Sequence, residues 1–482
     1  MSPQEGRTES LIAALLDTYR DNPGLIAARE QVKAQDEAVN QAADAFGPKL
    51  NVSAQAIDQQ SRVDEQVGPD QVSTVNTEGR WADTEADLVQ PLYTGGRLTA
   101  EMNAAKAERL AADQALREAE TRTFRAVVEA YVDVVRDTRV YAVDTHACEL
   151  LTEQLGAVQL MLKAGAATVS DQAEITARLA SAQAQLADAQ AQLLSSQAAF
   201  RDVVGRDPGD LPEVQDIPGL PASLQDAIDA SMRRNPTLRQ AGFAELAARE
   251  RVADARSAYA PQVSAEVSYQ SSPVLATEPN LRQSSTAGVI SVSIPLFDSG
   301  MRRAQVRQAS HQQAAAYYTE LESQRDVVQA VEVAWAALSG AKRALTLYDR
   351  QVHAQQTAFE SYDDQYHAGL LSTIDLLNVE QELTGAQLAR ANAARDVVST
   401  EADLLAAAGL LQADTVLPTD TPAPIGGEPP RRAAWLVGAG GPMGLVARTL
   451  DGVGAPAMSP AALPRASAVT AQSGAAPGSP QP

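Results

Sequence analysis

The sequence predicts a mainly α-helical chain built from two copies of a long helical hairpin, with four amphipathic β-strands inserted in pairs. Three observations predict this fold class. The chain of 482 residues contains an internal repeat. Two stretches, 92–207 and 296–417, contain no proline and carry apolar residues at helical spacing. Two shorter regions alternate apolar and polar residues at every second position, which is the period of a strand.

The internal repeat is visible in paired motifs. SLIAALLDTYRDNP begins at Ser10 and SLQDAIDASMRRNP begins at Ser223, so the two Asn-Pro pairs lie 213 residues apart. Further along, QPLYTGG matches IPLFDSG at a spacing of 204 residues, which is then kept to the end of both copies. One deletion of nine residues between Pro48 and Pro91 explains the change of spacing. A period this long indicates two copies of a whole structural unit rather than a solenoid repeat.

The repeat divides the chain into five segments. We expect an N-terminal remnant at 1–9, a first repeat at 10–205, a linker at 206–222, a second repeat at 223–412 and a tail at 413–482. The tail holds 12 of the 26 prolines and is rich in Ala and Gly. Such a composition cannot bury a core, so the tail is expected to be disordered. The N-terminal letters MSPQEGRTES lack an apolar core, so no export signal is visible as written.

Long helical hairpins are expected at about 95–205 and about 299–410. A proline in a helix interior costs roughly 3 kcal/mol, so its absence over such lengths favours long helices. Phe124, Val127 and Tyr131 fall at heptad spacing. A sustained heptad is typical of supercoiled, coiled-coil helices.

A glycine marks the predicted turn of each hairpin. Gly165 and Gly369 interrupt the two helical patterns, and each opens a G-x-x-(S/T)-x-x-D motif. We expect the Ser170-Asp171 and Ser372-Thr373 pairs to cap the returning helices. The first helix of each hairpin would then measure roughly 100 Å at 1.5 Å per residue.

Paired strands are expected at about 49–92 and about 262–298. The letters VSAEVSYQ alternate apolar and polar side chains, as in a strand with one apolar face. Polar segments near 61–77 and 273–284 are expected to be the connecting loops. A membrane barrel needs at least about eight strands, so four strands per chain would require an oligomer. A soluble sandwich would instead bury the apolar faces on each other, and the pattern alone leaves both possibilities open.

Composition excludes several classes of protein. The net charge is −22, and so acidic a surface disfavours nucleic-acid binding. Cys148 is the only cysteine, which excludes an intrachain disulfide and a cysteine-based zinc site. No catalytic, metal-binding or cofactor-binding motif is present, so we expect no enzyme activity, no metal and no cofactor.

Together these motifs resemble the TolC-like outer-membrane channel family, also called outer-membrane efflux proteins, over about 10–412. The resemblance is carried by the duplication, the NP-x-L letters, the QPLYTGG and IPLFDSG segments and the two tip motifs. QPLYTGGR is most like the members that serve type I protein secretion.

The resemblance implies a homotrimer in the outer membrane. Its helices would form a trimeric α-barrel through the periplasm, and its strands would close one shared 12-stranded β-barrel in outer-membrane lipid. The implied function is that of a passive conduit in a tripartite export system, for type I protein secretion or small-molecule efflux. A periplasmic adaptor (a membrane fusion protein) and an inner-membrane transporter are the implied partners.

The resemblance also places a periplasmic aperture at the hairpin tips. Tyr366 matches the gating tyrosine of the family and Asp375 its first constricting aspartate. Asn378 stands where a second aspartate is common, and Asp171 is the equivalent acid in the first copy. Leu371 stands where an arginine is frequent, so the charged network that holds the closed state is expected to be thinner here.

The same tips are expected to be the adaptor-docking surface. The residues involved are Gly165, Gly369, Leu370 and Ser372.

Other interpretations compete with the channel. The chain could be a soluble helical scaffold without channel activity, or a periplasmic adaptor, although the lipoyl-like domain and membrane anchor of adaptors are not visible. At the tips, Asp375 could simply be an early-turn acid favoured by the helix dipole, and Tyr366 could be a packing residue.

Overall fold

The computed structural model describes residues 10–417, apart from 69–70, 215, 276–277 and 369. Our expectations for 1–9 and for 418–482 lie outside the described residues. In chain order the elements are α1 (Leu11–Asp21), α2 (Pro23–Asp44), β1 (Lys49–Gly68), β2 (Gln71–Tyr93), α3 (Arg97–Lys163), α4 (Val169–Val204), α5 (Leu224–Arg234), α6 (Pro236–Ser257), β3 (Gln262–Leu275), β4 (Glu278–Ser293), α7 (Met301–His367), α8 (Thr373–Ala407) and α9 (Ala413–Val416). No helix in the described ranges combines the length and the apolar character needed to cross a bilayer.

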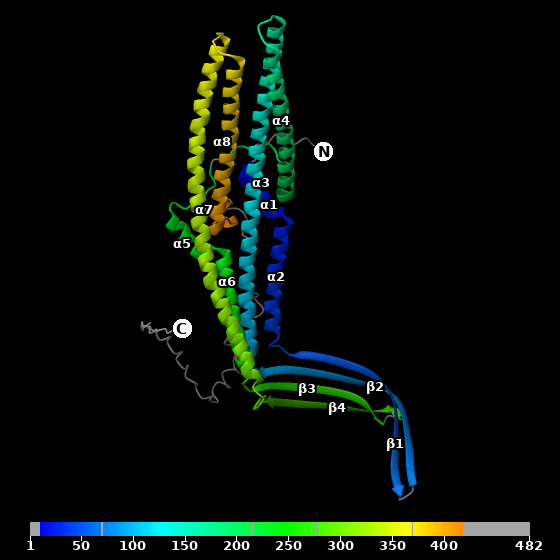
Figure 1. Ribbon diagram of the computed structural model, residues 1–482. Helices are drawn as coiled ribbons and strands as arrows, with labels where there is room; N and C mark the ends of the chain where they lie inside the picture. The colour runs from blue at the N-terminus through cyan, green and yellow to red at the C-terminus, as the bar shows by residue number, and fades with distance from the viewer. Residues whose placement is uncertain (1–9, 69–70, 215, 276–277, 369, 418–482) are drawn as a thin grey trace, which may run out of the picture. The chain divides into compact units, whose positions relative to one another are not determined.

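The elements of the first copy recur in the second in the same order (Figure 1). α1 and α5 have 11 residues each, α2 and α6 have 22, and α3 and α7 have 67. At 1.5 Å per residue α3 and α7 are each roughly 100 Å long. The predicted fold class of tandem long hairpins with four strands is therefore confirmed. The copies differ in their strands, because β1 and β2 have 20 and 23 residues whereas β3 and β4 have 14 and 16.

The Asn-Pro pair has the same structural role in both copies. Asn22 and Asn235 are the N-caps of α2 and α6, and proline takes the first helical position, where an N–H is not needed. The Asn22 side-chain amide also donates to the Val203 carbonyl of α4 at 3.2 Å, and the Asn235 amide donates to the Ala407 carbonyl of α8 at 3.0 Å. Each asparagine therefore joins the start of a short helix to the end of the returning helix.

Gly409 lies directly against the second of these junctions. Its φ is +68°, in the left-handed region, and an added Cβ would lie 2.7 Å from the backbone N and Cα of Asn235. Glycine is therefore needed here both for the backbone angle and for the close approach.

The largest apolar core surrounds the middle of α3. Phe124, Val127 and Tyr131 are completely buried, as the heptad spacing predicts. They pack with residues of α1, α4, α8 and α9 and with Ile217 of the 206–222 segment. The Tyr131 hydroxyl donates to the Pro212 carbonyl at 3.0 Å, so the segment between the copies is held against α3.

The first residues of the predicted tail belong to this core. Ala413 and Val416 of α9 are buried in it, and so is Leu417. The prediction of disorder from residue 413 is therefore wrong for 413–417. The prediction rested on the average composition of the whole tail, which does not reveal the short apolar segment 413–417 that packs into the core.

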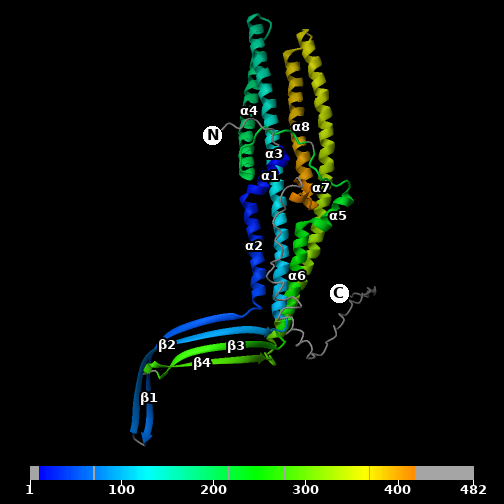
Figure 2. The same cartoon turned by 180° about the vertical axis from the view of Figure 1, so that it is seen from behind.

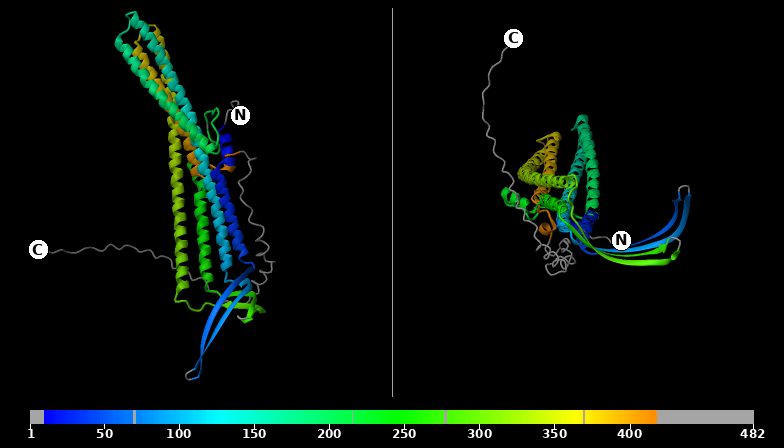
Figure 3. Two further views of the ribbon diagram at one scale, coloured as in Figure 1. Left: turned by 90° about the vertical axis from the view of Figure 1, so that its right-hand side faces the viewer. Right: turned by 90° about the horizontal axis from the view of Figure 1, so that it is seen from below.

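The four strands form one antiparallel sheet in the order β1-β2-β3-β4, which Figure 3 shows as a curved ribbon. Leu50 lies opposite Leu88, and Leu88 lies opposite Val267, so these three side chains share one face. Their exposed fractions are 69%, 39% and 48%. The sheet therefore has an apolar face that nothing in the described chain covers.

The other face of the sheet is polar and acidic. Glu85 lies opposite Ser53 on one side and Gln270 on the other, and Asp83, Asp87 and Glu266 occupy the same face by alternation. Within the described residues, the outer edges of β1 and β4 pair with no further strand.

The predicted loops near 61–77 and 273–284 are largely strand. β1 and β2 stay paired from Lys49↔Val89 to Gly68↔Gln71, and β3 and β4 from Gln262↔Ser293 to Leu275↔Glu278. The prediction was wrong because these ends carry polar side chains on both faces, so the alternation signal fades while the backbone ladder continues.

Candidate functional site at the hairpin tips

The first tip joins α3 to α4 through residues 164–168. Gly165 has φ +74°, and the Ala166 N–H donates to the Met161 carbonyl at 2.8 Å to close the end of α3. Thr168, not the predicted Ser170, is the N-cap of α4; Ser170 lies inside the helix. Thr168 is the cap because its hydroxyl accepts a hydrogen bond from the backbone N–H of Asp171, three residues later in the chain.

Asp171 completes a capping box at this tip. Its carboxylate accepts from the backbone N–H of Thr168 at 2.8 Å, and its own N–H donates to the Thr168 hydroxyl at 3.2 Å. The hydrogen bonds from the Thr168 backbone and side chain lower the pKa of Asp171, because they favour the ionised form. Asp171 therefore carries a negative charge at the start of α4.

The second tip repeats this arrangement between α7 and α8. Ser372 is the N-cap of α8, as expected, and its hydroxyl donates to the Asp375 carboxylate at 2.6 Å. The Asp375 N–H donates back to the Ser372 hydroxyl at 3.3 Å. Leu370 is 74% exposed at this tip, whereas Gly369 lies outside the described residues.

Tyr366 lies in the last turn of α7 and contacts its own tip. Its ring is 5.6 Å from the His367 ring, and its hydroxyl accepts from the Thr373 hydroxyl at 3.5 Å. The side chain therefore bridges the end of α7 and the start of α8. In the described chain, none of the predicted residues Tyr366, Asp375 and Asp171 hydrogen-bonds to the other tip.

Asn378 does connect the two hairpins. Its side-chain oxygen accepts from the Arg178 guanidinium of α4 at 2.9 Å, while the same guanidinium pairs with Glu174 at 3.0 Å. Figure 2 shows α4 and α8 in the two hairpins that Arg178 and Asn378 link. Arg178 supplies a cation near the tips although Leu371 stands where the family often has an arginine.

Glu380 lies two residues beyond Asn378 on α8 and is buried. It lines a cavity of about 110 Å³ together with Arg178 and Leu377. Burial raises the pKa of Glu380 to about 7, and the nearby Arg178 charge offsets part of this rise. A carboxyl group that titrates near neutral pH thus lies at the contact between the hairpins.

Sequence reasoning missed Arg178 and Glu380. The spacing of Glu174 and Arg178, four residues apart on one helix, does predict an ion pair along α4. Nothing in the local sequence shows that Arg178 also reaches α8, because that contact joins residues 200 positions apart.

Comparisons with known proteins agree with this architecture. The model of the family described as "Outer membrane efflux protein" matches residues 17–206 and 227–410. The outer membrane efflux protein BepC of Brucella suis is 27% identical over 415 residues, covering 86% of this chain and 88% of BepC. The alkaline protease secretion protein AprF of Pseudomonas aeruginosa is 27% identical over 195 residues, covering 40% of each chain. Among solved structures, the CmeC outer membrane channel of Campylobacter jejuni superimposes with a TM-score of 0.69 at 16% identity, covering 86% of this chain and 91% of CmeC.

Proposed function

The chain belongs to the outer membrane efflux protein family, and from this premise we propose that it is the outer-membrane channel-tunnel of a tripartite export system. Its location is the outer membrane, with the helical part extending into the periplasm. The family that the sequence motifs resemble is thereby confirmed. We further propose that the conduit is passive and performs no catalysis, with an inner-membrane transporter supplying the energy and a periplasmic adaptor connecting the two.

The open sheet is the observation that best supports this proposal. It has an exposed apolar face, an acidic opposite face and two unpaired edges in the described chain. An exposed apolar face and free edges are both unfavourable in water. Three copies would join their edges and supply twelve strands, enough to close a barrel with its apolar face toward outer-membrane lipid. The acidic face would then line the lumen.

The soluble scaffold is disfavoured by the same observation. A soluble hairpin cap would bury its apolar side chains on each other, whereas Leu50, Leu88 and Val267 face outward.

The tips are proposed as the periplasmic entrance. Tyr366, Asp375, Asn378 and Asp171 would form the aperture, and three copies of the two acids around one axis would give a negative potential that acts on charged cargo. Gly165, Leu370 and Ser372, with Gly369, would dock the adaptor. The contact between Arg178 and Asn378 would help to hold the two hairpins of one chain together.

For the cargo we propose only a class of molecule. The chain resembles both BepC, an efflux protein by name, and AprF, a protease secretion protein by name. Type I protein secretion and small-molecule efflux can use the same tube, because the inner-membrane partner selects what enters.

Single-channel recording tests this function. The full chain, produced behind a secretion signal and reconstituted in planar bilayers, is expected to insert and give discrete, uniform conductance steps. A protein that stays soluble without detergent and leaves the bilayer current unchanged would support the scaffold instead.

A further inference from the structure

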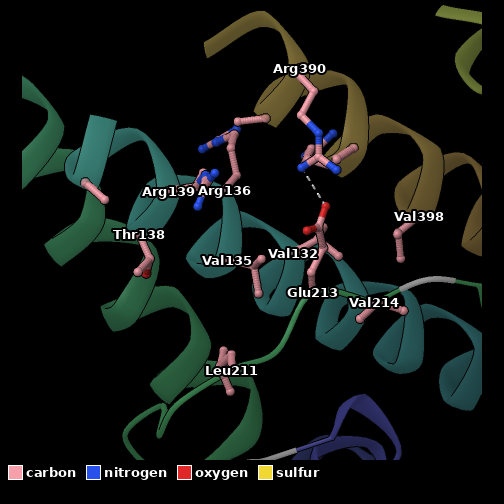
Figure 4. Close-up of a pocket in the computed structure, with 14 residues that line it drawn as sticks. Val132, Val135, Arg136, Thr138, Arg139, Leu211, Glu213, Val214, Arg390 and Val398 are labelled. Carbon is pink, nitrogen blue, oxygen red and sulfur yellow. Dashed lines mark hydrogen bonds and ion pairs between the residues drawn. The ribbon is translucent and has the colours of Figure 1, made fainter. Parts of the chain in front are cut away.

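A cavity of about 460 Å³ lies away from the tips, between α3, the 206–222 segment and α8 (Figure 4). Its α3 wall ends near Ala142, about 22 residues before the first tip, or roughly 30 Å along the helix. The cavity is formed by one chain alone. Volumes of this size hold one drug-sized molecule.

Four arginines line this cavity, in a chain whose net charge is −22. They are Arg136, Arg139, Arg390 and Arg395. Figure 4 shows Arg136 and Arg139 on the α3 side and Arg390 on the α8 side. Two helices that are far apart in the sequence, α3 and α8, thus bring four positive charges to one cavity.

The acids that pair with these arginines mostly lie outside the cavity. Arg136 pairs with Asp137 at 2.7 Å and Arg395 with Asp133 at 2.9 Å, and neither aspartate lines the cavity. Glu213 is the only carboxylate among the lining residues, and it pairs with Arg390 at 3.0 Å.

Arg139 differs from the other three arginines. Within the described residues its guanidinium makes no hydrogen bond or ion pair. Arg390 also pairs with Asp349 at 3.1 Å and Arg395 with Asp396 at 3.3 Å, so acids neutralise three of the four arginines. The exposed guanidinium of Arg139 is left free to bind an anion.

The floor of the cavity is apolar, and the 206–222 segment of the same chain packs against it. Val132, Val135 and Val398 line the floor. Leu211 and Val214 of the 206–222 segment also line it, while Glu213 between them pairs with Arg390 (Figure 4). The cavity thus already binds a carboxylate flanked by two apolar side chains, and both come from the same chain.

We propose that the cavity binds a small amphipathic organic anion. Its carboxylate is held by Arg139, with Arg136 beside it, and its apolar body lies on Val132, Val135 and Val398. A planar guanidinium fork binds a carboxylate through two parallel hydrogen bonds. The floor removes the rest of the ligand from water. This site depends on the fold of one chain and not on the proposed export function.

Calorimetric titration of the purified full chain in detergent tests the site, with naphthalene-2-carboxylate as the probe. The heat of titrating the probe into detergent alone is subtracted. Saturable binding of about one carboxylate per chain is expected. The neutral isostere naphthalene-2-carboxamide is expected to bind at least about tenfold more weakly, because it lacks the charge that strengthens the hydrogen bonds.

Matched variants separate the site from general effects of charge. Arg139→Gln is expected to weaken carboxylate binding by about tenfold or more. Arg122→Gln, an exposed arginine on the same helix outside the cavity, is expected to leave it unchanged. Glu213→Gln removes the competing carboxylate and is expected to strengthen binding. The proposal is overturned if the wild-type chain shows no saturable binding, if the carboxamide binds as well as the carboxylate, or if Arg139→Gln and Arg122→Gln have equal effects.

Discussion

Glu380→Gln is expected to stabilise the protein at pH 8 and to have almost no effect on stability at pH 4. Glu380 is 8% exposed, at the place where α8 packs against α3 and α4 of the first hairpin. Burial raises its pKa from 4.5 to about 7, so the folded state favours the neutral, protonated form. Glutamine keeps the size and polarity of that neutral form without acquiring a charge as pH rises.

The expected size of the effect follows from the pKa shift. A rise of about 2.5 pKa units at about 1.4 kcal/mol per unit corresponds to a cost of about 3 kcal/mol per chain when Glu380 is ionised. Because the folded pKa is raised, this cost is absent below pH 4.5, grows between pH 4.5 and 7, and is fully present above pH 7. The stability of the wild-type chain should therefore fall across that window relative to the variant.

Urea unfolding followed by circular dichroism at pH 4 and at pH 8 measures this difference. Glu382→Gln on the same helix is the control, because Glu382 is exposed and its loss should not change the pH dependence. Equal stability differences between Glu380→Gln and the wild type at both pH values, or destabilisation by the variant at pH 8, would refute the reasoning.

Three further predictions concern the caps, the junction and the contact between the hairpins. Ser372→Ala removes the N-cap of α8 and is expected to cost about 1 kcal/mol, seen as faster hydrogen exchange in the first turn of that helix; unchanged exchange would contradict the capping role. Gly409→Ala is expected to lower the yield of folded protein and its midpoint of thermal unfolding, because the added Cβ meets the Asn235 backbone at 2.7 Å. Wild-type stability of this variant would show that the close approach is absent. Arg178→Ala removes the hydrogen bond to Asn378 and is expected to raise single-channel conductance, whereas an unchanged conductance would show that this contact does not restrain the tips.

The long helices and their turns could be predicted because their signals are local and strong. Heptad spacing at Phe124, Val127 and Tyr131 directly indicates a helix, and a glycine followed by a capping motif indicates where that helix ends. The duplication strengthens each signal by presenting it twice. The same signals place Asp171 and Asp375 at the first turn of their helices, where the structure finds them.

Other features depend on contacts that no local pattern reports. The burial of α9 requires a core built from helices hundreds of residues earlier in the chain. The ends of the strands carry no alternation, yet backbone pairing extends them. Arg178 and Glu380 gain their environments only when α4 meets α8, so their part in the tip region appears first in three dimensions.

Electron microscopy of the full chain, produced behind a secretion signal and extracted in detergent, tests the channel most directly. Hollow particles with three-fold symmetry are expected, more than about 100 Å long because α3 alone has 67 residues, with a detergent belt around the strands at one end. Solid single-chain rods without a central lumen or a detergent belt would contradict the channel, because the open sheet would then close no barrel.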